Sequence, residues 1–296
     1  MTISWYPGHM HKASKELAKL ADRIDGLIEV LDARTPLASM NPRLQFLRDT
    51  KPVILILNKA DLADAEITQR WQKLLNQQER CACLVNGRDT PLQARQIAAA
   101  ATRLTPKAES NRRKRRQLAI AGIPNVGKSS LLNLLCQRKV AKTGNEPAVT
   151  QAMQPVKLDD DWTLIDTPGL LWPKLEDQHQ AYLLAMTGTI RQTALDIEDA
   201  GWYAAEVLLN LYPERLSERY ALPAGLTSAE AVFEGIAAGR GALSRGGRPD
   251  FNKVAELLLN ELRSGKLGRL SFENPDQAFE NPEQAIESPH QAPEER

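Results

Sequence analysis

The stretch Gly122-Ile-Pro-Asn-Val-Gly127-Lys128-Ser129 decides the fold, because it matches the whole G-x-x-x-x-G-K-S pattern of a phosphate-binding P-loop. The apolar run Leu118–Ala121 precedes it and predicts a strand, and the run Ser130–Cys136 follows it and predicts a helix. A P-loop requires this strand-to-helix context, so a chance glycine turn is a poor alternative. The chain is therefore expected to bind the phosphates of a nucleotide.

The residue types in this loop each have a chemical reason. Glycines let the backbone curl until successive N–H groups point at phosphate oxygens, and the N-terminus of the following helix adds positive potential. We expect Lys128 to bridge the terminal phosphates and the hydroxyl of Ser129 to bind Mg²⁺. The residues expected to contact nucleotide here are Gly122, Asn125, Val126, Gly127, Lys128, Ser129 and Ser130.

Apolar runs with the length of buried parallel strands occur on both sides of the P-loop strand, and helix-like stretches separate most of them. This alternation predicts an α/β fold with a mostly parallel sheet and helices on both faces. Ligands of such sheets bind at the carboxyl ends of the strands. The predicted strands are Gly26–Leu31, Val53–Leu57, Ala82–Val85, Leu118–Ala121 and Thr163–Ile165, and helices are expected at 12–24, 67–76 and 92–102.

The base is predicted from Asn58-Lys59-Ala-Asp61, which stands where a predicted strand ends. The carboxylate of Asp61 can accept both N1–H and N2–H of guanine, whereas adenine would leave that buried carboxylate unpaired. We expect Lys59 to cover one face of the base and Asn58 to tie this loop to the P-loop. Asn86-Gly87 follows the next strand and is a weaker candidate for supporting the ring, because Asn-Gly is commonly just a turn.

Two further segments predict contacts with Mg²⁺ and the γ-phosphate. Asp166-Thr-Pro-Gly169 follows the strand Thr163–Ile165, so Asp166 is placed to hold Mg²⁺ through a water, and the backbone N–H of Gly169 to meet a γ-phosphate. Thr150 lies between the P-loop and this motif, where a switch threonine would close on Mg²⁺. An ordinary loop threonine is the alternative.

The order of the motifs is unusual, because the guanine loops precede the P-loop. This order predicts a circular permutant of a Ras-like GTPase, which keeps its sheet if the original termini lie close together. Beyond about residue 176 only helical patterns occur, at 199–211, 228–238 and 251–263. We predict a GTPase domain at 1–175 that begins with an amphipathic helix, a small all-helical domain at 176–271, and an acidic disordered tail at 272–296.

The composition is that of an ordinary globular protein, with 42% hydrophobic and 25% charged residues. Three cysteines without zinc spacing predict a reducing compartment and no structural metal, and the lack of a long apolar run or leader pattern predicts a cytoplasmic protein that does not cross a membrane. Residues 272–296 hold seven acidic residues and one basic residue, so the remainder carries 37 basic against 30 acidic residues. A basic body suggests a polyanionic partner.

Six segments together make the chain resemble the ribosome biogenesis GTPase A (YlqF-type) family over nearly all of residues 1–275. They are Trp5-Tyr-Pro-Gly-His-Met10, Asp32-Ala-Arg-Thr-Pro36, Asn58-Lys-Ala-Asp61, the P-loop with its Pro124-Asn125, Asp166-Thr-Pro-Gly-Leu-Leu-Trp-Pro173 and Gly268-Arg-Leu-Ser-Phe272. The resemblance implies a circularly permuted GTPase domain, a helical RNA-binding domain, and a role in late maturation of the large (50S) ribosomal subunit. Ala148 stands where this family usually has glycine, although Thr150 is retained.

The nucleotide motifs do not supply a group that positions the attacking water. Ras-like enzymes place a glutamine shortly after the glycine of the Asp166–Gly169 motif, but this chain has leucines there, which cannot hold a water. The resemblance points instead to His9, with a structural or rRNA-contacting histidine as the alternative. It also matches Asn125 to a residue that helps to bind K⁺ beside the phosphates. The expected catalytic residues are His9, Lys128 and Gly169, with GTP, Mg²⁺ and K⁺ bound.

The expected partner is the precursor of the large subunit and its rRNA, bound in a nucleotide-dependent way, with neither membrane nor DNA. Phosphate contacts are expected from Arg112–Arg116 and Lys266–Arg269. Asp32 and Arg34 are expected to cap the turn at Pro36 rather than to brace the switch. Turnover is expected to be slow alone and stimulated by the subunit; the oligomeric state is left open, with a monomer as the expectation.

Two other functions compete with this interpretation. A permuted GTPase acting on the small subunit is one alternative, although proteins resembling that kind usually carry an OB-fold or a zinc-binding module. Here only about 25 residues precede the first predicted strand, and three cysteines are not expected to form a zinc module. The other is a non-catalytic RNA-binding assembly factor that uses nucleotide only as a switch. Hydrolysis measured with and without ribosomal subunits separates this second alternative from a GTPase.

Overall fold

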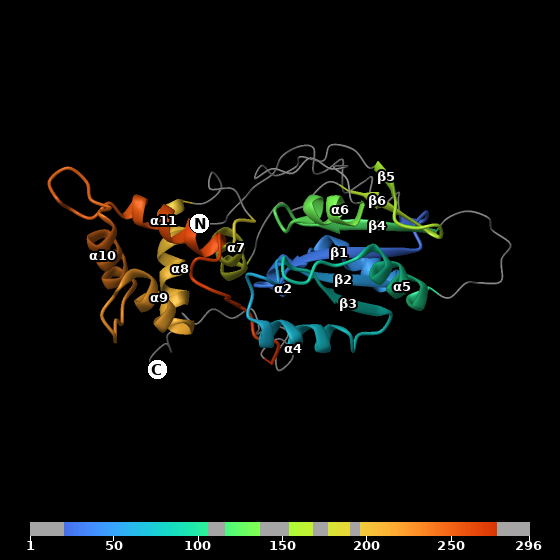
Figure 1. Cartoon of the computed structure of the whole chain (residues 1–296), viewed down its shortest axis with the longest axis horizontal. Helices are drawn as coiled ribbons and strands as arrows, with labels where there is room; N and C mark the ends of the chain where they lie inside the picture. The colour runs from blue at the N-terminus through green and yellow to red at the C-terminus, as the bar shows by residue number, and fades with distance from the viewer. Residues whose placement is uncertain (1–20, 106–115, 137–153, 168–176, 190–195, 277–296) are drawn as a thin grey trace, which may run out of the picture. The chain divides into compact units, whose positions relative to one another are not determined.

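The computed structural model describes residues 21–105, 116–136, 154–167, 177–189 and 196–276, and the chain divides into two compact units (Figure 1). We call residues 21–167 of the described chain the α/β unit and residues 177–276 the helical unit. Most of the predicted N-terminal helix and most of the predicted acidic tail lie outside the described residues.

The α/β unit is built on a six-stranded sheet with the strand order β3-β2-β1-β4-β6-β5. Every neighbouring pair is parallel except β5 and β6, which are antiparallel. The predicted mostly parallel α/β fold is therefore confirmed, while the short strand β5 was missed because it lacks an apolar run. The strands are β1 (Gly26–Asp32), β2 (Val53–Asn58), β3 (Cys81–Val85), β4 (Arg116–Gly122), β5 (Gln154–Lys157) and β6 (Trp162–Asp166).

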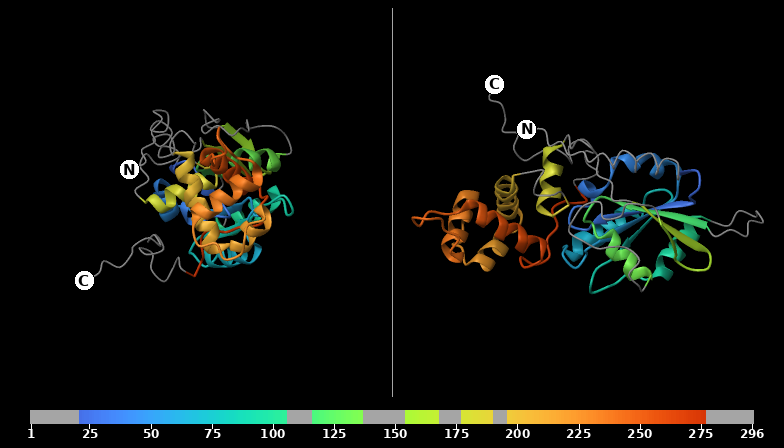
Figure 2. Two further views of the ribbon diagram at one scale, coloured as in Figure 1. Left: turned by 90° about the vertical axis from the view of Figure 1, so that its left-hand side faces the viewer. Right: turned by 90° about the horizontal axis from the view of Figure 1, so that it is seen from above.

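Helices lie on both faces of this sheet (Figure 2). Because both faces are covered, every residue of β1 and β2 is buried, which explains why these strands are apolar almost throughout instead of alternating. Helices α4 and α5 pack against β2 and β3, and α6 packs against β4. The helical segments of the unit are α2 (Pro36–Ser39), the 3₁₀ turn η1 (Pro42–Leu44), α3 (Gln45–Thr50), α4 (Ala65–Leu75), α5 (Ala94–Leu104) and α6 (Lys128–Cys136).

The helical unit contains α7 (Gln178–Met186), α8 (Ile197–Leu211), α9 (Pro213–Tyr220), α10 (Ala229–Arg240) and α11 (Phe251–Arg263). Four of these helices begin at a residue whose side chain accepts a backbone N–H of the first turn, as helix N-caps do; the four are Asp177, Asp196, Ser228 and Asp250. The helices α8, α10 and α11 match the predicted ones, while α7 and α9 are additional. Within the described ranges, no helix is long and apolar enough to span a bilayer.

Helices α8 and α11 pack closely against each other. A Cβ added at Gly201 on α8 would lie 2.4 Å from the Cβ of Ala255 and 2.8 Å from its Cα. The absence of a side chain at Gly201 therefore sets how closely the two helix backbones approach. Beside this contact, Trp202 stacks on Phe233 with 4.0 Å between the ring centroids, which joins α10 to the same core.

Candidate functional site

The P-loop lies where the sequence predicts it, between the end of β4 and the start of α6. Its backbone needs glycine at two points. A Cβ at Gly122 would lie 2.8 Å from the carbonyl oxygen of Val30 on the neighbouring strand, and Gly127 has φ of +93°. Asn125 also has a positive φ, +59°, which asparagine tolerates better than most residues. The loop thus has the curled backbone that directs N–H groups at phosphates.

Lys128 and Asp166 lie together at the carboxyl ends of β4 and β6. The ammonium of Lys128 donates to a carboxylate oxygen of Asp166, and both side chains are buried. Burial lowers the pKa of Lys128, and the charge of Asp166 opposes that shift. Both groups lie at the carboxyl ends of parallel strands, the edge of such a sheet where ligands bind. Next to them, Thr167 donates its hydroxyl to the carbonyl of Ile120 over 2.8 Å, which fastens the end of β6 to β4.

Asn58 joins the guanine loop to the P-loop across 68 residues of sequence. Its amide nitrogen donates to the carbonyl of Val126 over 2.6 Å, and its amide oxygen accepts from the side chain of Asn86 over 2.6 Å. The oxygen of Asn86 in turn accepts the N–H of Leu92 over 2.8 Å. The Asn-Gly after β3 is therefore a structural link in the site and more than a turn. A Cβ at Gly127 would lie 2.3 Å from the amide nitrogen of Asn58, so the two loops touch.

Asp61 lies next to the residues that follow β3. One carboxylate oxygen accepts the backbone N–H of Arg88 over 3.1 Å, and the other lies 3.3 Å from the Nε of the same residue. A Cβ at Gly87 would lie 2.9 Å from the backbone nitrogen of Asp61, so glycine allows this close approach. The guanidinium of Arg88 is 83% exposed, so it holds Asp61 only loosely.

Lys59 forms an ion pair with Asp32, a contact that its sequence pattern did not predict. The ammonium of Lys59 lies 2.9 Å from one oxygen of Asp32, which also accepts from Arg34 over 2.8 Å. The other oxygen accepts the backbone N–H and the Nε of Arg34 over 3.1 Å and 2.9 Å. Asp32 thus both caps its own turn, as expected, and anchors a guanine-loop side chain. The sequence does contain a signal for this contact: Asp32 and Asn58 each end a buried strand, so their loops can meet at one edge of a parallel sheet.

The charge of Asp32 is retained although the residue is completely buried. Burial alone would raise its pKa, but the cationic groups of Arg34 and Lys59 and their hydrogen bonds outweigh burial and hold the pKa far below its usual value. Burial lowers the pKa of Lys59, and Asp32 opposes that shift. Lys59 also has a positive φ, +59°, a backbone conformation that is costly for a lysine. The Asp32 contact therefore stabilises a strained residue of the guanine loop.

Three predicted site residues lie outside the described residues, namely His9, Thr150 and Gly169. The others, from Asn58 to Asp166, lie in the last residues of β2, β4 and β6, on the loops that follow β2, β3 and β4, and in the first turn of α6. Ser129 and Ser130 stand in the first turn of α6, partly buried and exposed respectively. The structure thus brings together the described members of the predicted set, at the carboxyl ends of the parallel strands.

The predicted basic contacts differ from the expectation at Arg116. Its guanidinium lies 4.0 Å from the ring centroid of Trp162 and donates to the carbonyl of Thr105 over 2.6 Å. This side chain is committed to holding β4 and α5 together, so it is not a free phosphate contact. The rest of the cluster, residues 112–115, lies outside the described residues. In the helical unit, Lys266 is 59% exposed, and its ammonium lies 3.7 Å from a carboxylate oxygen of Glu261. This negative charge reduces the attraction of Lys266 for an RNA phosphate.

Comparisons with known proteins identify relatives of this chain. The sequence profile of a family described as "50S ribosome-binding GTPase" matches residues 117–206. Ribosome biogenesis GTPase A of Bacillus cereus is 41% identical over 283 residues, covering 94% of this chain and 95% of that protein. The protein of the same name from Thermotoga maritima is 31% identical over 275 residues, covering 93% and 95%. A GNP-bound crystal structure of YlqF from T. maritima superimposes with a TM-score of 0.63 at 25% identity, covering 90% of this chain and 99% of that one.

Proposed function

Because this chain belongs to the ribosome biogenesis GTPase A family and is a GTPase of ribosome assembly, we propose that it acts in late maturation of the large (50S) ribosomal subunit. The observation that carries the nucleotide half of the proposal is the hydrogen bond from Asn58 to Val126. It joins the loop that selects guanine to the loop that holds phosphates, as one nucleotide spanning both would require. The description of the matching family profile as a 50S ribosome-binding GTPase supports the choice of subunit.

We propose that Lys128, Ser129 and Asp166 hold the triphosphate and its Mg²⁺. The donor set fits this metal, because a carboxylate and a hydroxyl are hard oxygen ligands. The buried ion pair of Lys128 and Asp166 fits the metal as well. When nucleotide binds, Lys128 can pair with the negative phosphates and Asp166 with the positive metal. Lys128 turns to the phosphates and Asp166 to the water shell of the metal. Bound Mg²⁺ neutralises charge that develops on the phosphate oxygens.

Specificity for guanine is proposed to come from Asp61, with Lys59 over the ring and Asn58, Asn86 and Gly87 shaping the pocket. The carboxylate of Asp61 needs two N–H donors, and the loosely held guanidinium of Arg88 leaves as the base enters. Adenine cannot supply that donor pair, so it leaves a carboxylate unpaired at a cost of about 1–3 kcal/mol. Replacing Asp61 by asparagine is therefore expected to reduce discrimination between GTP and ATP in competition binding.

The water that attacks the γ-phosphate is proposed to be oriented by His9, with Thr150 and Gly169 completing the switch. Asn125 is proposed to share in a K⁺ site, where the cation offsets charge that develops on the phosphates. Single-turnover hydrolysis in K⁺ and Na⁺ buffers tests this, and equal rates in the two salts would contradict the K⁺ site. A His9→Ala protein that hydrolyses GTP at the wild-type rate on ribosomal subunits would contradict the role of His9.

The partner is proposed to be the rRNA of the large-subunit precursor, bound in one nucleotide state and released in the other, with the subunit stimulating hydrolysis. Sedimentation with purified large-subunit precursors, in GDP and in a non-hydrolysable GTP analogue, tests this proposal. Binding is expected to be stronger with the GTP analogue. Equal binding in both states, or preference for small subunits, contradicts the proposal.

The predicted organisation stays part of this proposal. The GTPase domain would occupy residues 1–175, the RNA-binding domain 176–271 and the acidic tail 272–296. Because ribosome assembly in bacteria takes place in the cytoplasm, we propose that location for the protein. Limited proteolysis followed by mass spectrometry tests the boundaries, since cleavage is expected near residues 175 and 272 and not within either domain.

A further inference from the structure

The connection between α10 and α11 is an ordered hairpin rather than a loose loop. We call residues 242–249 the arginine hairpin. Leu243 and Pro249 form an isolated antiparallel bridge, and the N–H of Ser244 donates to the carbonyl of Arg248 over 2.8 Å. The N–H of Gly247 donates to the carbonyl of Ser244 over 3.1 Å, which closes a four-residue turn.

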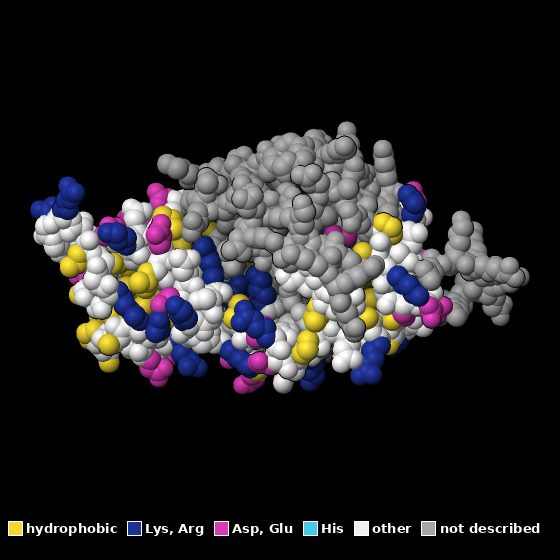
Figure 3. Space-filling view, turned by 45° about the horizontal axis from the view of Figure 1, so that its top comes forward, with side chains coloured by type: hydrophobic (Ala, Val, Ile, Leu, Met, Phe, Trp, Pro, Cys, Tyr) yellow, Lys and Arg dark blue, Asp and Glu magenta, His cyan; other side chains and the backbone are white. Residues whose placement is uncertain are grey.

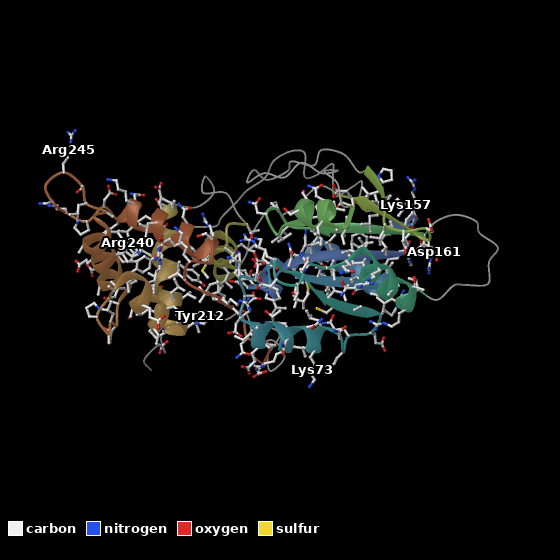
Figure 4. The ribbon with its side chains drawn as sticks, in the orientation of Figure 1. Lys73, Lys157, Asp161, Tyr212, Arg240 and Arg245 are labelled. Atoms are coloured by element: carbon white, nitrogen blue, oxygen red, sulfur yellow. The ribbon has the colours of Figure 1, made fainter. Side chains whose placement is uncertain are left out.

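Glycine makes this turn possible and places an arginine at its tip. Gly246 is the third residue of the turn and has φ of +94°, which a type II turn requires at that position. Gly247 continues with φ of +77°. No atom lies within 4 Å of a Cβ built at either glycine, so the space above both is open. Arg245, the second residue of the turn, extends away from the helices (Figure 4).

The hairpin carries positive charge that no acidic side chain of the described residues neutralises by an ion pair. Residues 239–249 contain three arginines and no acidic residue. Arg245 and Arg248 are exposed, and neither makes an ion pair with another described residue. The nearest carboxylate in sequence, Asp250, caps α11 and lies 3.0 Å from the ammonium of Lys253. Figure 3 shows dark-blue basic side-chain atoms at the left-hand end of the molecule.

The third arginine, Arg240, differs from the other two because its side chain contacts other residues of the helical unit. Arg240, at the end of α10, donates to the carbonyl of Arg219 over 3.1 Å and lies 5.5 Å from the ring centroid of Tyr220. It therefore stabilises the helical unit, whereas the two hairpin arginines have no such contact among the described residues. Their charges are exposed on a fixed backbone, without a stabilising role inside the unit.

We propose that the arginine hairpin binds the sugar-phosphate backbone of a structured RNA, with Arg245 and Arg248 each contacting a phosphate. The ordered turn reduces the conformational entropy that two arginines lose on binding. The open space above Gly246 and Gly247 lets the backbone approach closely. Leu243, 41% exposed at the base of the hairpin, supplies an apolar contact to ribose.

The chemistry of this surface favours RNA over an acidic protein. Protein interfaces centre on buried aromatic or aliphatic anchors, and the hairpin offers only the single side chain of Leu243. Double-stranded RNA is recognised mainly through phosphate and 2′-hydroxyl contacts across its wide, shallow minor groove, into which a narrow hairpin fits. This inference rests on the proposed function, and it names a surface of the helical unit that would contact rRNA.

The test compares the full-length double variant Arg245→Ala/Arg248→Ala with wild type, both in the GTP-analogue state. Binding to large-subunit precursors and to protein-free rRNA is measured between 50 and 300 mM KCl. Two lost phosphate contacts should make the slope of log K against log salt less steep by about 1.4–1.8 and reduce affinity roughly 25- to 60-fold near 0.1 M salt. The matched control Lys73→Ala/Arg95→Ala removes two exposed charges from the α/β unit.

The outcomes separate this inference from the proposed function. If wild type does not bind large-subunit precursors, the proposed function fails. If wild type binds and the double variant shows the same slope and affinity, only the hairpin inference is overturned. A loss on precursors without a loss on protein-free rRNA identifies a protein partner and also overturns it. A smaller slope on both substrates, with unchanged intrinsic GTP hydrolysis and an unaffected control variant, is the expected result.

Discussion

Asp32→Asn tests whether the buried carboxylate beneath Lys59 holds the guanine loop in its binding conformation. The substitution keeps the size and shape of the side chain and removes its charge. Asp32 accepts four hydrogen bonds, three from Arg34 and one from Lys59. Asparagine has one acceptor oxygen, so its NH₂ group faces two donors if the oxygen keeps the contacts to the backbone N–H and Nε of Arg34.

The magnitude follows from what is lost. A hydrogen bond to a charged group contributes about 1.5–3 kcal/mol, and leaving a buried charge without its partner costs about 3–5 kcal/mol of folding free energy. If the whole free energy of the Lys59 contact contributes to nucleotide binding, a loss of about 1.5–3 kcal/mol lowers affinity for GDP by roughly 10- to 140-fold. Discrimination between guanine and adenine should survive, because it depends on Asp61.

The assay pairs equilibrium binding of fluorescent GDP with urea unfolding. The matched control is Glu29→Gln, on the same strand and equally buried, whose carboxylate accepts from Arg48 over 2.6 Å and from the N–H of Asn41 over 2.8 Å. Both variants should lose stability, but only Asp32→Asn should lose affinity. In a double-mutant cycle with Lys59→Gln, the two substitutions should be non-additive. The reasoning is refuted if Asp32→Asn and Glu29→Gln lose the same affinity, or if the effects of Asp32→Asn and Lys59→Gln are additive.

Further substitutions test the packing of each unit. Gly127→Ala should lower GTP affinity by at least about tenfold, because a Cβ there would lie 2.3 Å from the amide nitrogen of Asn58 and φ is +93°; normal binding would show that the loops move apart freely. Gly201→Ala should destabilise the helical unit by about 1–3 kcal/mol in denaturant unfolding. Gly239→Ala, whose Cβ would have 3.6 Å of space, should not, so equal effects would contradict close packing as the cause. Asp32 should also contribute pH-dependent stability: its depressed pKa means that the contribution is complete above about pH 4 and declines at lower pH. The stability difference between wild type and Asp32→Asn should therefore shrink as pH falls from 5 to 2, and a constant difference would disagree.

The sequence was sufficient for features that depend on local chemistry. Glycines at 122 and 127 are needed where the backbone must curl, and a lysine and serine follow them at fixed spacing, so the phosphate loop is readable without a structure. Five of the six strands were equally readable, because a sheet covered on both faces requires continuous apolar runs, whereas β5 lacks such a run. The roles of His9, Thr150 and Gly169 stay predictions, since these residues lie outside the described ranges.

Other features depended on which strand ends become neighbours. The sequence placed Asp32 in a turn of its own, but only the parallel pairing of β1 with β2 brings it beneath Lys59. Arg116 looks like part of a basic run, yet the pairing of β4 with β6 sets its guanidinium over Trp162. The residues around such a side chain in the sequence do not reveal its non-local contact, because the order of the strands in the sheet decides which partner lies beside it. Residue chemistry therefore determined the kind of ligand, and the tertiary structure decided which charges are available to meet it.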